Sequence, residues 1–227
     1  MDEPWVPSPG RGRVNQKQRT RRAIVDAAKR LAASGSEFTM PVVAREALVS
    51  EATAYRYFPD LASLLREADE GTWPSPEDAL APVAGSTDAV ERVAFAAGFL
   101  FRGVLANQGA VRAMIAASIT KPDGYERPAH RLGLIDHALA PVAERLGAGG
   151  LAQLRRDLAV VLSADALFTV LDLCRLEPEA AIASAVETAR RVTRAALAEA
   201  DVSTDTGGTD VASGVGATDG SGGTVSN

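Results

Sequence analysis

Apolar residues recur every three or four positions along most of the chain, which is the spacing of one face of an α-helix. In the first such segment Ile24, Ala27, Ala28 and Leu31 share one helical face, and Gly35 ends the helix. No stretch alternates apolar and polar residues in the manner of a half-buried β-strand. The pattern therefore predicts an all-α protein.

Two short helices and the start of a fourth follow this first helix. Thr39 and Ser50 are suited to cap the second and third helices, because their side-chain oxygens can accept hydrogen bonds from free backbone N–H groups. Asp60 can cap the fourth in the same way. A short helix, a tight turn and a second short helix form a helix-turn-helix, which places its second helix in the major groove of DNA. We expect this DNA-binding domain to span residues 16–70, with three helices forming the helix-turn-helix unit.

A connector interrupted by prolines (71–86) leads to a larger helical domain at 87–199. Within it the apolar spacing predicts helices at about 87–107, 109–118, 127–146, 149–173 and 177–199. The Pro/Gly-rich leader (1–15) and the tail (200–227), in which 16 of 28 residues are Gly, Ser or Thr, are predicted to be disordered. Such segments cannot bury enough apolar surface to offset the entropy lost on ordering.

Charge is divided unevenly along the chain, whose net charge is −5. Residues 1–60 carry 10 basic and 7 acidic side chains, while the remaining residues carry 14 and 22. Within 10–30 there are eight basic side chains, opposed only by Asp26. This concentration at one end indicates a surface for phosphate groups. The alternative is a basic tail that serves only solubility.

Other features of the sequence limit the possible classes of protein. No apolar run approaches the roughly 18 residues that cross a membrane, and the start of the chain lacks the apolar core of a secretory signal. The single Cys174 fits a reducing compartment, so we expect a cytoplasmic protein without a membrane partner.

Neither catalytic nor metal-binding chemistry is indicated. His130 and His137 stand two turns apart on one expected helix, roughly 10.5 Å by helical rise, which is too far for one metal ion. We interpret both histidines as structural or pocket-lining. No zinc motif, phosphate loop or nucleophile–base arrangement is recognisable. We therefore expect no metal, no cofactor and no enzymatic activity.

Three stretches carry a recognisable pattern: AIVDAAKRLAASG, TMPVVAREALVS and ATAYRYFPDLASLL. They resemble the N-terminal domain of the tetracycline-repressor (TetR) family of bacterial regulators over roughly residues 18–68. The rest of the chain resembles the family only in length, helical character and two long C-terminal helices. Leu48 departs from the pattern at a turn position where the family usually has Gly, and a Leu there is strained if φ is positive. Leu61 replaces a Lys that commonly touches a phosphate.

The resemblance implies which residues meet DNA. By position these are Thr53, Tyr55, Arg56 and Tyr57, and Glu51 begins the same helix. Thr39 and Ser50 are added because helix starts attract phosphate. The charge of the basic arm adds Arg11, Arg13, Lys17, Arg19, Arg21 and Arg22, which would offset the missing Lys at position 61. The two tyrosines would donate hydroxyls to phosphates or present their rings to thymine methyl groups. Arg56 would contact phosphate or read a guanine edge. For Glu51 we favour interaction with the helix dipole over acceptance from cytosine N4. Phe58 is predicted to be a core residue rather than a base contact.

The resemblance also implies a ligand pocket in the larger domain. The candidate lining residues are Phe95, Phe99, Phe101, Arg102, Met114, His137, Asp165 and Phe168. Asp165 and Asp172 are carboxylates within an apolar helix, and seven residues of spacing put them on one face. Because an unpaired buried carboxylate is costly, we expect exposure or an ion pair in preference to a ligand contact.

Together these features imply a ligand-responsive transcriptional regulator. The expected protein is a repressor that binds a palindromic operator in double-stranded DNA as a homodimer, through its two C-terminal helices, and is released by a small-molecule effector. One alternative is a helical ligand-binding or protein-interaction module that has lost specific operator recognition, as Leu48 and Leu61 suggest. Another is a small all-α enzyme, which the scarcity of His and Cys disfavours.

Overall fold

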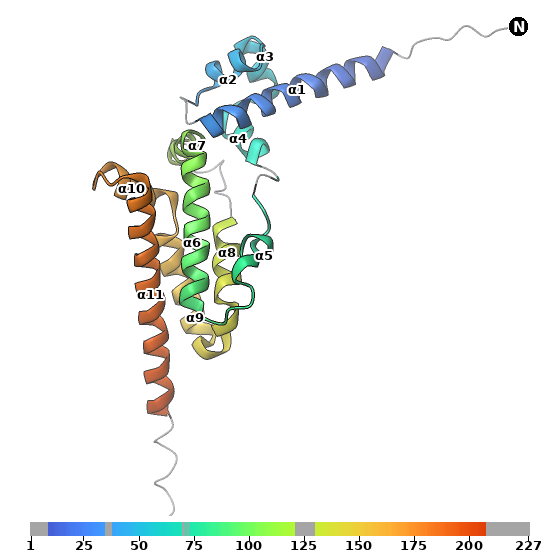
Figure 1. Cartoon of the computed structure of the whole chain (residues 1–227). Coiled ribbons are helices and arrows are strands. Elements are labelled where there is room, and N and C mark those ends of the chain that lie inside the picture. Colours follow the sequence, from blue (N-terminus) through green and yellow to red (C-terminus); the bar gives the residue numbers. More distant parts are fainter. Residues whose placement is uncertain (1–8, 35–37, 70, 72, 121–129, 208–227) are drawn as a thin grey trace, which may run out of the picture.

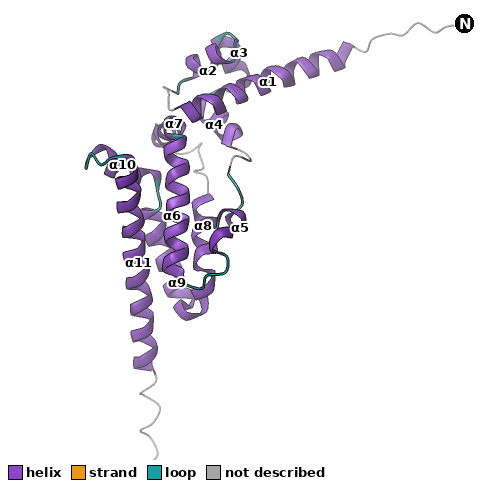
Figure 2. Cartoon of the chain, viewed as in Figure 1, coloured by secondary structure: helices purple, strands orange, loops and turns teal. Residues whose placement is uncertain are grey.

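The structure is a computed structural model that describes residues 9–34, 38–69, 71, 73–120 and 130–207. In these ranges the chain forms helices joined by loops and turns, without a strand (Figure 2), so the predicted all-α class is confirmed. The N-terminal helices are α1 (Pro9–Ser34), α2 (Met40–Glu46), α3 (Glu51–Tyr57) and α4 (Leu61–Asp69). The larger domain contains α5 (Pro76–Ala79), the 3₁₀ turn η1 (Ala81–Val83), α6 (Ala89–Ala106), α7 (Gln108–Thr120), α8 (His130–Leu139), the 3₁₀ turn η3 (Ala140–Val142), α9 (Ala143–Val161), α10 (Ala164–Asp172) and α11 (Pro178–Gly207).

The two groups of helices lie at opposite ends of an elongated molecule (Figure 1). In the N-terminal group α1 packs against α2 and α4, while α2 packs against α3. In the larger domain the long helices α6 and α11 pack together, with α8 and α9 alongside. Helix α7 of the larger domain connects the two groups of helices, because it packs against both α1 and α4 of the N-terminal group.

The N-terminal domain has its own hydrophobic core. The predicted core residues Ile24, Ala27 and Ala28 of α1 are fully buried, and Phe58 is 1% exposed at the end of α3. The core role predicted for Phe58 is therefore confirmed. Ala110 of α7 belongs to the same cluster, so one helix of the larger domain closes this core. The DNA-binding helices are thus packed directly onto the second domain.

Side-chain caps start the short helices where the sequence predicts them. The Ser50 hydroxyl accepts a hydrogen bond from the backbone N–H of Thr53 at 3.1 Å, and the Asp60 carboxylate accepts one from Ser63 at 2.8 Å. Thr39 occupies the N-cap position of α2, but its side chain makes no capping hydrogen bond. Each side-chain cap contributes about 1 kcal/mol to a helix, which matters for helices of seven and nine residues.

The outermost helices extend further than the sequence analysis predicts. Helix α1 begins at Pro9 and includes residues 9–15, which were assigned to a disordered leader. Proline suits the first turn of a helix, where its missing N–H is not needed. Helix α11 continues to Gly207, beyond the predicted end at 199. Residues 1–8 and 208–227 lie outside the described residues, so disorder in these two segments stays a prediction.

Two predicted long helices are each divided in the structure. The predicted helix at 127–146 ends as α8 at Leu139 and passes into a 3₁₀ turn that contains Pro141. Gly147 then kinks α9 with a φ of 64°. The predicted helix at 149–173 is interrupted at Ser163, whose hydroxyl caps α10 by accepting the N–H of Ala166 at 3.1 Å. Apolar spacing alone does not reveal such breaks, because apolar residues recur every three or four positions both before and after each break.

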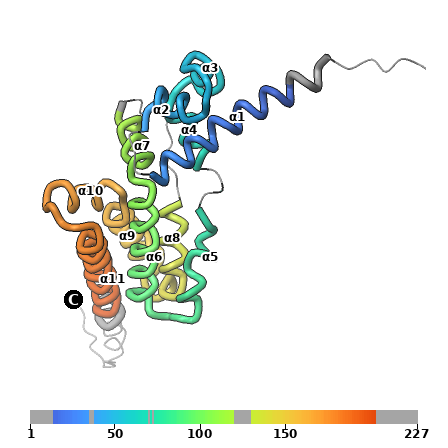
Figure 3. Tube along the Cα trace, turned by 45° about the horizontal axis from the view of Figure 1, so that its top comes forward, coloured from blue at the N-terminus to red at the C-terminus, as the bar shows by residue number. Residues whose placement is uncertain are grey.

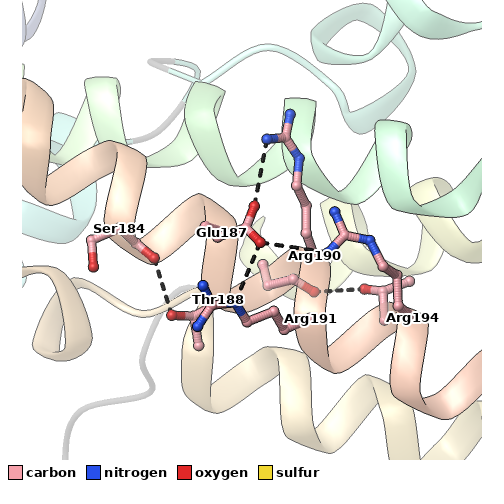
Figure 4. A network of polar contacts seen from close by, with 8 residues as sticks. Ser184, Glu187, Thr188, Arg190, Arg191 and Arg194 are labelled. Atoms are coloured by element: carbon pink, nitrogen blue, oxygen red, sulfur yellow. Dashed lines mark hydrogen bonds and ion pairs between the residues drawn. The ribbon is translucent and has the colours of Figure 1, made fainter.

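Helix α11 carries a network of charged side chains along one side (Figure 4). Glu187 lies within 4 Å of three arginines, at 3.8 Å from Arg190, 3.3 Å from Arg191 and 3.5 Å from Arg194. Exposed pairs of this kind contribute only about 0.3–0.5 kcal/mol each. The helix is held mainly by its buried residues, which pack against α6 and α9.

Candidate DNA-binding surface and interdomain cavity

The recognition helix α3 presents most of its predicted contact residues to solvent. Glu51, Tyr55 and Arg56 are exposed, whereas Thr53 and Tyr57 are half-buried. The hydroxyl of Ser50 donates to that of Thr53 at 2.9 Å, so these two side chains are fixed together at the start of α3. Exposed polar side chains on a short helix held by its buried face can reach DNA without rearrangement of the fold.

Tyr57 has two roles in the structure. Its ring packs partly against the N-terminal core, and the guanidinium of Arg56 lies 5.7 Å from the ring centroid. Its backbone carbonyl accepts a hydrogen bond from Arg21 at 3.3 Å. Tyr57 therefore links the exposed face of α3 to the rest of the domain.

The turn before α3 keeps the backbone geometry that the family pattern requires. Leu48 has a φ of 56° and is 93% exposed. A side chain in this left-handed region costs roughly 1–2 kcal/mol, and glycine avoids that cost. The sequence-based concern about strain at Leu48 is therefore confirmed. Leu61, the second departure from the family pattern, is half-buried and packs against the N-terminal core.

Replacing Leu48 by Gly is expected to stabilise the N-terminal domain by about 1 kcal/mol, because the positive φ is then unstrained. Ala47, the preceding residue, has a φ of −79° and provides a matched control. Ala47→Gly should destabilise the domain by about 0.5–1 kcal/mol through added freedom of the unfolded chain. Urea unfolding of both variants measures the difference, and a destabilised Leu48→Gly variant would show that the strain argument is wrong.

The basic arm forms the N-terminal half of α1. The side chains of Lys17, Arg19 and Arg22 are exposed. Arg11 and Arg13 lie on the same helix, and their side chains are outside the part that the structure describes. Figures 1 and 3 place this half of α1 at the same end of the molecule as α3. An exposed row of cations there would extend the surface available to DNA phosphates.

Arg21 differs from the other arm residues because it is engaged within the domain. Its Nε donates to the Glu67 carboxylate at 2.8 Å, and its Nη2 bonds the second oxygen of the same group. The guanidinium also lies 4.5 Å from the ring centroid of Phe58. Arg21 therefore ties α1 to α4 and to the end of α3, and its predicted DNA contact stays a prediction.

A cavity of about 360 Å³ lies between the N-terminal domain and the larger domain. Its volume falls within the range of about 300–1,000 Å³ that is typical of small-molecule sites. The walls come from α1, α4, α6, α7, α8, the connector and the α9–α10 junction, and they are mostly apolar. The lining residues used below are Lys29, Leu65, Ala68, Asp69, Trp73, Val111, Met114, His130, Arg131 and Asp165.

Two of the eight predicted ligand residues, Met114 and Asp165, line this cavity. The other six do not: Phe95, Phe99, Phe101, Arg102, His137 and Phe168. Most of these aromatic rings pack into or against the core instead, because burial of a large apolar ring is favourable. Phe101 is fully buried, and Phe168 is buried beneath the guanidinium of Arg112, 3.9 Å from its ring centroid.

The two carboxylates noted in the apolar helix have different surroundings. Asp172 is exposed, as predicted, and accepts two hydrogen bonds of 2.8 Å from Arg112 within the same chain. Those hydrogen bonds lower the pKa of Asp172. Asp165 is half-buried at the cavity wall. The same helix therefore supplies one carboxylate to an interhelical pair and another to the cavity.

The sequence analysis did not single out Trp73, which forms one wall of the cavity. Its Nε1 donates to the carboxylate of Asp69 at 2.9 Å, and its ring lies 5.0 Å from that of His130. The ring of Phe99 packs edge-on against it, with 6.2 Å between the two ring centroids. A Cβ added to Gly103 would lie 2.3 Å from the indole, so this glycine makes room for it. A lone tryptophan in a Pro/Gly-rich connector was the signal available in the sequence.

His130 lies beside Trp73 in the cavity wall. Its Nε2 atom is buried and has no hydrogen-bond partner in the part of the chain that the structure describes. Burial lowers the pKa of His130, and the nearby charge of Asp69 opposes that shift. The ring is therefore neutral near pH 7, and a neutral imidazole nitrogen can donate or accept one hydrogen bond.

The described ranges contain neither a candidate metal site nor a membrane-spanning helix. There, His, Cys, Asp and Glu side chains form no group of three or more that could hold a metal ion. Likewise, no helix in these ranges has the length and apolar character needed to cross a membrane.

The folded N-terminal unit is a helix-turn-helix domain of the DNA-binding type, with its recognition helix at the surface. Residues 24–68 match the model of the tetR family of bacterial regulatory proteins. The matched segment runs from the buried half of α1 to the end of α4. This match confirms the resemblance of the N-terminal domain to the tetR family that the sequence motifs predict. Neither a curated protein nor a solved structure gave a match.

Proposed function

We propose that this protein is a ligand-responsive transcriptional repressor that binds a palindromic operator as a homodimer and is released by a small molecule. The observation that carries the proposal is the position of the cavity. It is bounded by α1 and α4 of the DNA-binding domain on one side and by α6, α7 and α8 on the other. A molecule bound there contacts both domains and can favour one relative arrangement of them.

Helix α4 supplies a physical route from the cavity to the recognition helix. Leu65 and Ala68 line the cavity, and Glu67 on the same helix holds Arg21. Arg21 in turn donates to the carbonyl of Tyr57 at the end of α3. A displacement of α4 would therefore be transmitted to α3 through the Arg21–Glu67 ion pair and the hydrogen bond from Arg21 to the Tyr57 carbonyl. The ligand lowers DNA affinity only by the difference between its affinities for the two arrangements.

Exposed apolar residues support the homodimer. Val160 near the end of α9 and Leu173 after α10 are large and exposed, and Leu176 precedes α11 in the same region. A two-fold dimer through the C-terminal helices would cover such residues and place two recognition helices about 34–36 Å apart, one turn of DNA. Sedimentation equilibrium should give twice the chain mass of 23.6 kDa. A monomer at micromolar concentration would contradict the dimer.

Selection of genomic DNA fragments by the purified protein, at about physiological salt, tests the DNA-binding part. We expect enrichment of a palindromic site. The rival proposal, a helical module without operator recognition, draws on the strained Leu48 and the apolar Leu61. It predicts weak binding that depends steeply on salt and shows no preferred sequence. Failure to enrich any site would favour that rival.

Replacing Arg56 by Ala is expected to weaken binding to the selected operator by about 1–3 kcal/mol if Arg56 reads a base edge, and to relax specificity at that position. If Arg56 contacts phosphate, binding should weaken on all sequences and the salt dependence should become shallower. Arg102→Ala is the matched control, since Arg102 is exposed on α6 of the larger domain, far along the chain from α3 and outside the proposed dimer surface. Fluorescence anisotropy at several salt concentrations measures both effects, and unchanged binding would exclude a contact by Arg56.

A further inference from the structure

The charges that the described residues place around the interdomain cavity balance one another. Lys29 and Arg131 contribute two cations, and Asp69 and Asp165 contribute two carboxylates. Asp69 already accepts the indole N–H of Trp73. The remaining walls are mostly apolar. An ionised ligand entering this cavity would lose its hydration without gaining a net opposite charge, and that loss is costly.

His130 also lines the cavity, and its ring lies 5.0 Å from that of Trp73. Its Nε2 atom is buried and is therefore closed to the cavity as well as to bulk solvent. The site therefore offers a ligand two neighbouring rings rather than a hydrogen bond to Nε2.

The indole of Trp73 defines the shape of the site beside His130. It is held from one side by Gly103, where any Cβ would clash, and from another by the ring of Phe99. Its N–H is fixed by Asp69. A tryptophan held in this way offers a preorganised aromatic wall, and little conformational entropy is lost when a ligand packs against it.

We propose that the interdomain cavity binds an uncharged, largely apolar and partly aromatic small molecule, whose rings pack beside Trp73 and His130. This assignment names the chemical class of the effector, and its regulatory consequence rests on the proposed function. The binding itself can be measured without DNA.

The chain offers a built-in reporter for this site. It contains two tryptophans, Trp5 and Trp73. In a Trp5→Phe background, the remaining fluorescence comes from the cavity wall. The probe is N-phenyl-1-naphthylamine, which is neutral and aromatic and has one N–H group. We expect it to quench Trp73 through energy transfer, with saturation at micromolar concentration.

A charged analogue tests the ligand class. The compound 8-anilinonaphthalene-1-sulfonate has the same ring skeleton as the neutral probe and carries a sulfonate. We expect it to bind at least about tenfold more weakly, which is about 1.4 kcal/mol, because the described lining of the cavity has no net positive charge to receive the sulfonate. Equal or tighter binding of the sulfonate would overturn the neutral class.

Two variants of α7 test the location. Val111 lines the cavity, and Val111→Phe should fill part of it and weaken binding of the neutral probe at least about tenfold. Ile119 lies on the same helix, is 70% exposed and does not line the cavity, so Ile119→Phe is the matched control and should leave binding unchanged. Equal affinity in both variants would place the probe elsewhere and overturn the proposal. Thermal unfolding checks that both variants fold.

The result with DNA separates the two proposals. If the probe binds as expected but leaves binding to the selected operator unchanged, the ligand class of the cavity is supported and the ligand response fails. If no neutral probe binds while an operator is selected, the cavity proposal fails and DNA recognition stands.

Discussion

Replacing Arg92 by Met is expected to lower the free energy of unfolding of the larger domain by about 3 kcal/mol. Arg92 lies on α6 and is only 4% exposed. Its acceptors are backbone carbonyls: Nη1 donates to Val83 at 2.8 Å, Nη2 to His137 at 2.8 Å and Nε to Ala138 at 3.2 Å. Methionine keeps an apolar stem of similar length but removes every donor. Each buried carbonyl left without a donor costs about 1–3 kcal/mol, partly offset because the charge no longer has to be buried.

The position of these carbonyls explains why an arginine stands here. His137 and Ala138 are in the last turn of α8, where backbone carbonyls have no partner within the helix and the helix dipole is negative. Val83 ends the 3₁₀ turn of the connector. One planar guanidinium therefore closes the end of α8 and fixes the connector against α6. Lysine has a single nitrogen and cannot reach all three groups, so Arg92→Lys should recover only part of the loss.

Chemical unfolding followed by circular dichroism measures this effect, with Arg102→Met as the control. Arg102 is on the same helix and is exposed, so its replacement should change stability by no more than about 0.5 kcal/mol. Equal stability of the two variants would show that the carbonyls near Arg92 find other donors. A loss in Arg92→Met that Arg92→Lys fully restores would indicate that charge, rather than the number of hydrogen bonds, is what the site requires.

Arg92 also illustrates what the sequence could not predict. Apolar spacing located most helices, and the short polar residues Ser50 and Asp60 marked two helix starts, because both signals are local. A buried arginine has no local signature, since most arginines are exposed. Its role depends on carbonyls about nine and 45 residues away. Contacts of that kind appear only when the helices are placed in space.

The cavity was missed for a related reason. Aromatic residues were chosen as pocket candidates by their chemistry, yet rings such as Phe101 and Phe168 serve the core. The cavity is instead lined by residues of both domains and of the connector, which are far apart in the sequence. The predicted DNA contacts of α3 are neighbours in sequence as well as in space, so a single motif points to them, and their contact with DNA stays a prediction.

Replacing Phe58 by Ala is expected to destabilise the N-terminal domain by about 3–5 kcal/mol, the usual cost of removing a buried phenylalanine side chain. The effect should be at the upper end for two reasons. Phe58 is 1% exposed within a small core in which many other buried residues are alanines, so neighbouring side chains cannot fill the space. It also supports the guanidinium of Arg21, which joins α1 to α4.

This variant should unfold the N-terminal domain before the larger one, because the two hydrophobic clusters have no residue in common in the described ranges and α6, α8, α9 and α11 form a core of their own. Hydrogen exchange should show loss of protection in α2, α3 and α4 with retention in α6 and α11. Binding to the selected operator should be lost, while the neutral probe loses affinity because α1 and α4 form part of its site.

Tyr55→Ala provides the contrast within the same helix. Tyr55 is 47% exposed, so its removal should cost little stability. If Tyr55 contacts DNA, operator affinity should fall while hydrogen exchange and probe binding stay unchanged. A Phe58→Ala variant that keeps its protection but loses operator binding would instead make Phe58 a DNA contact, against the burial seen in the structure. The pair of variants thus separates residues that stabilise the recognition helix from residues that contact DNA.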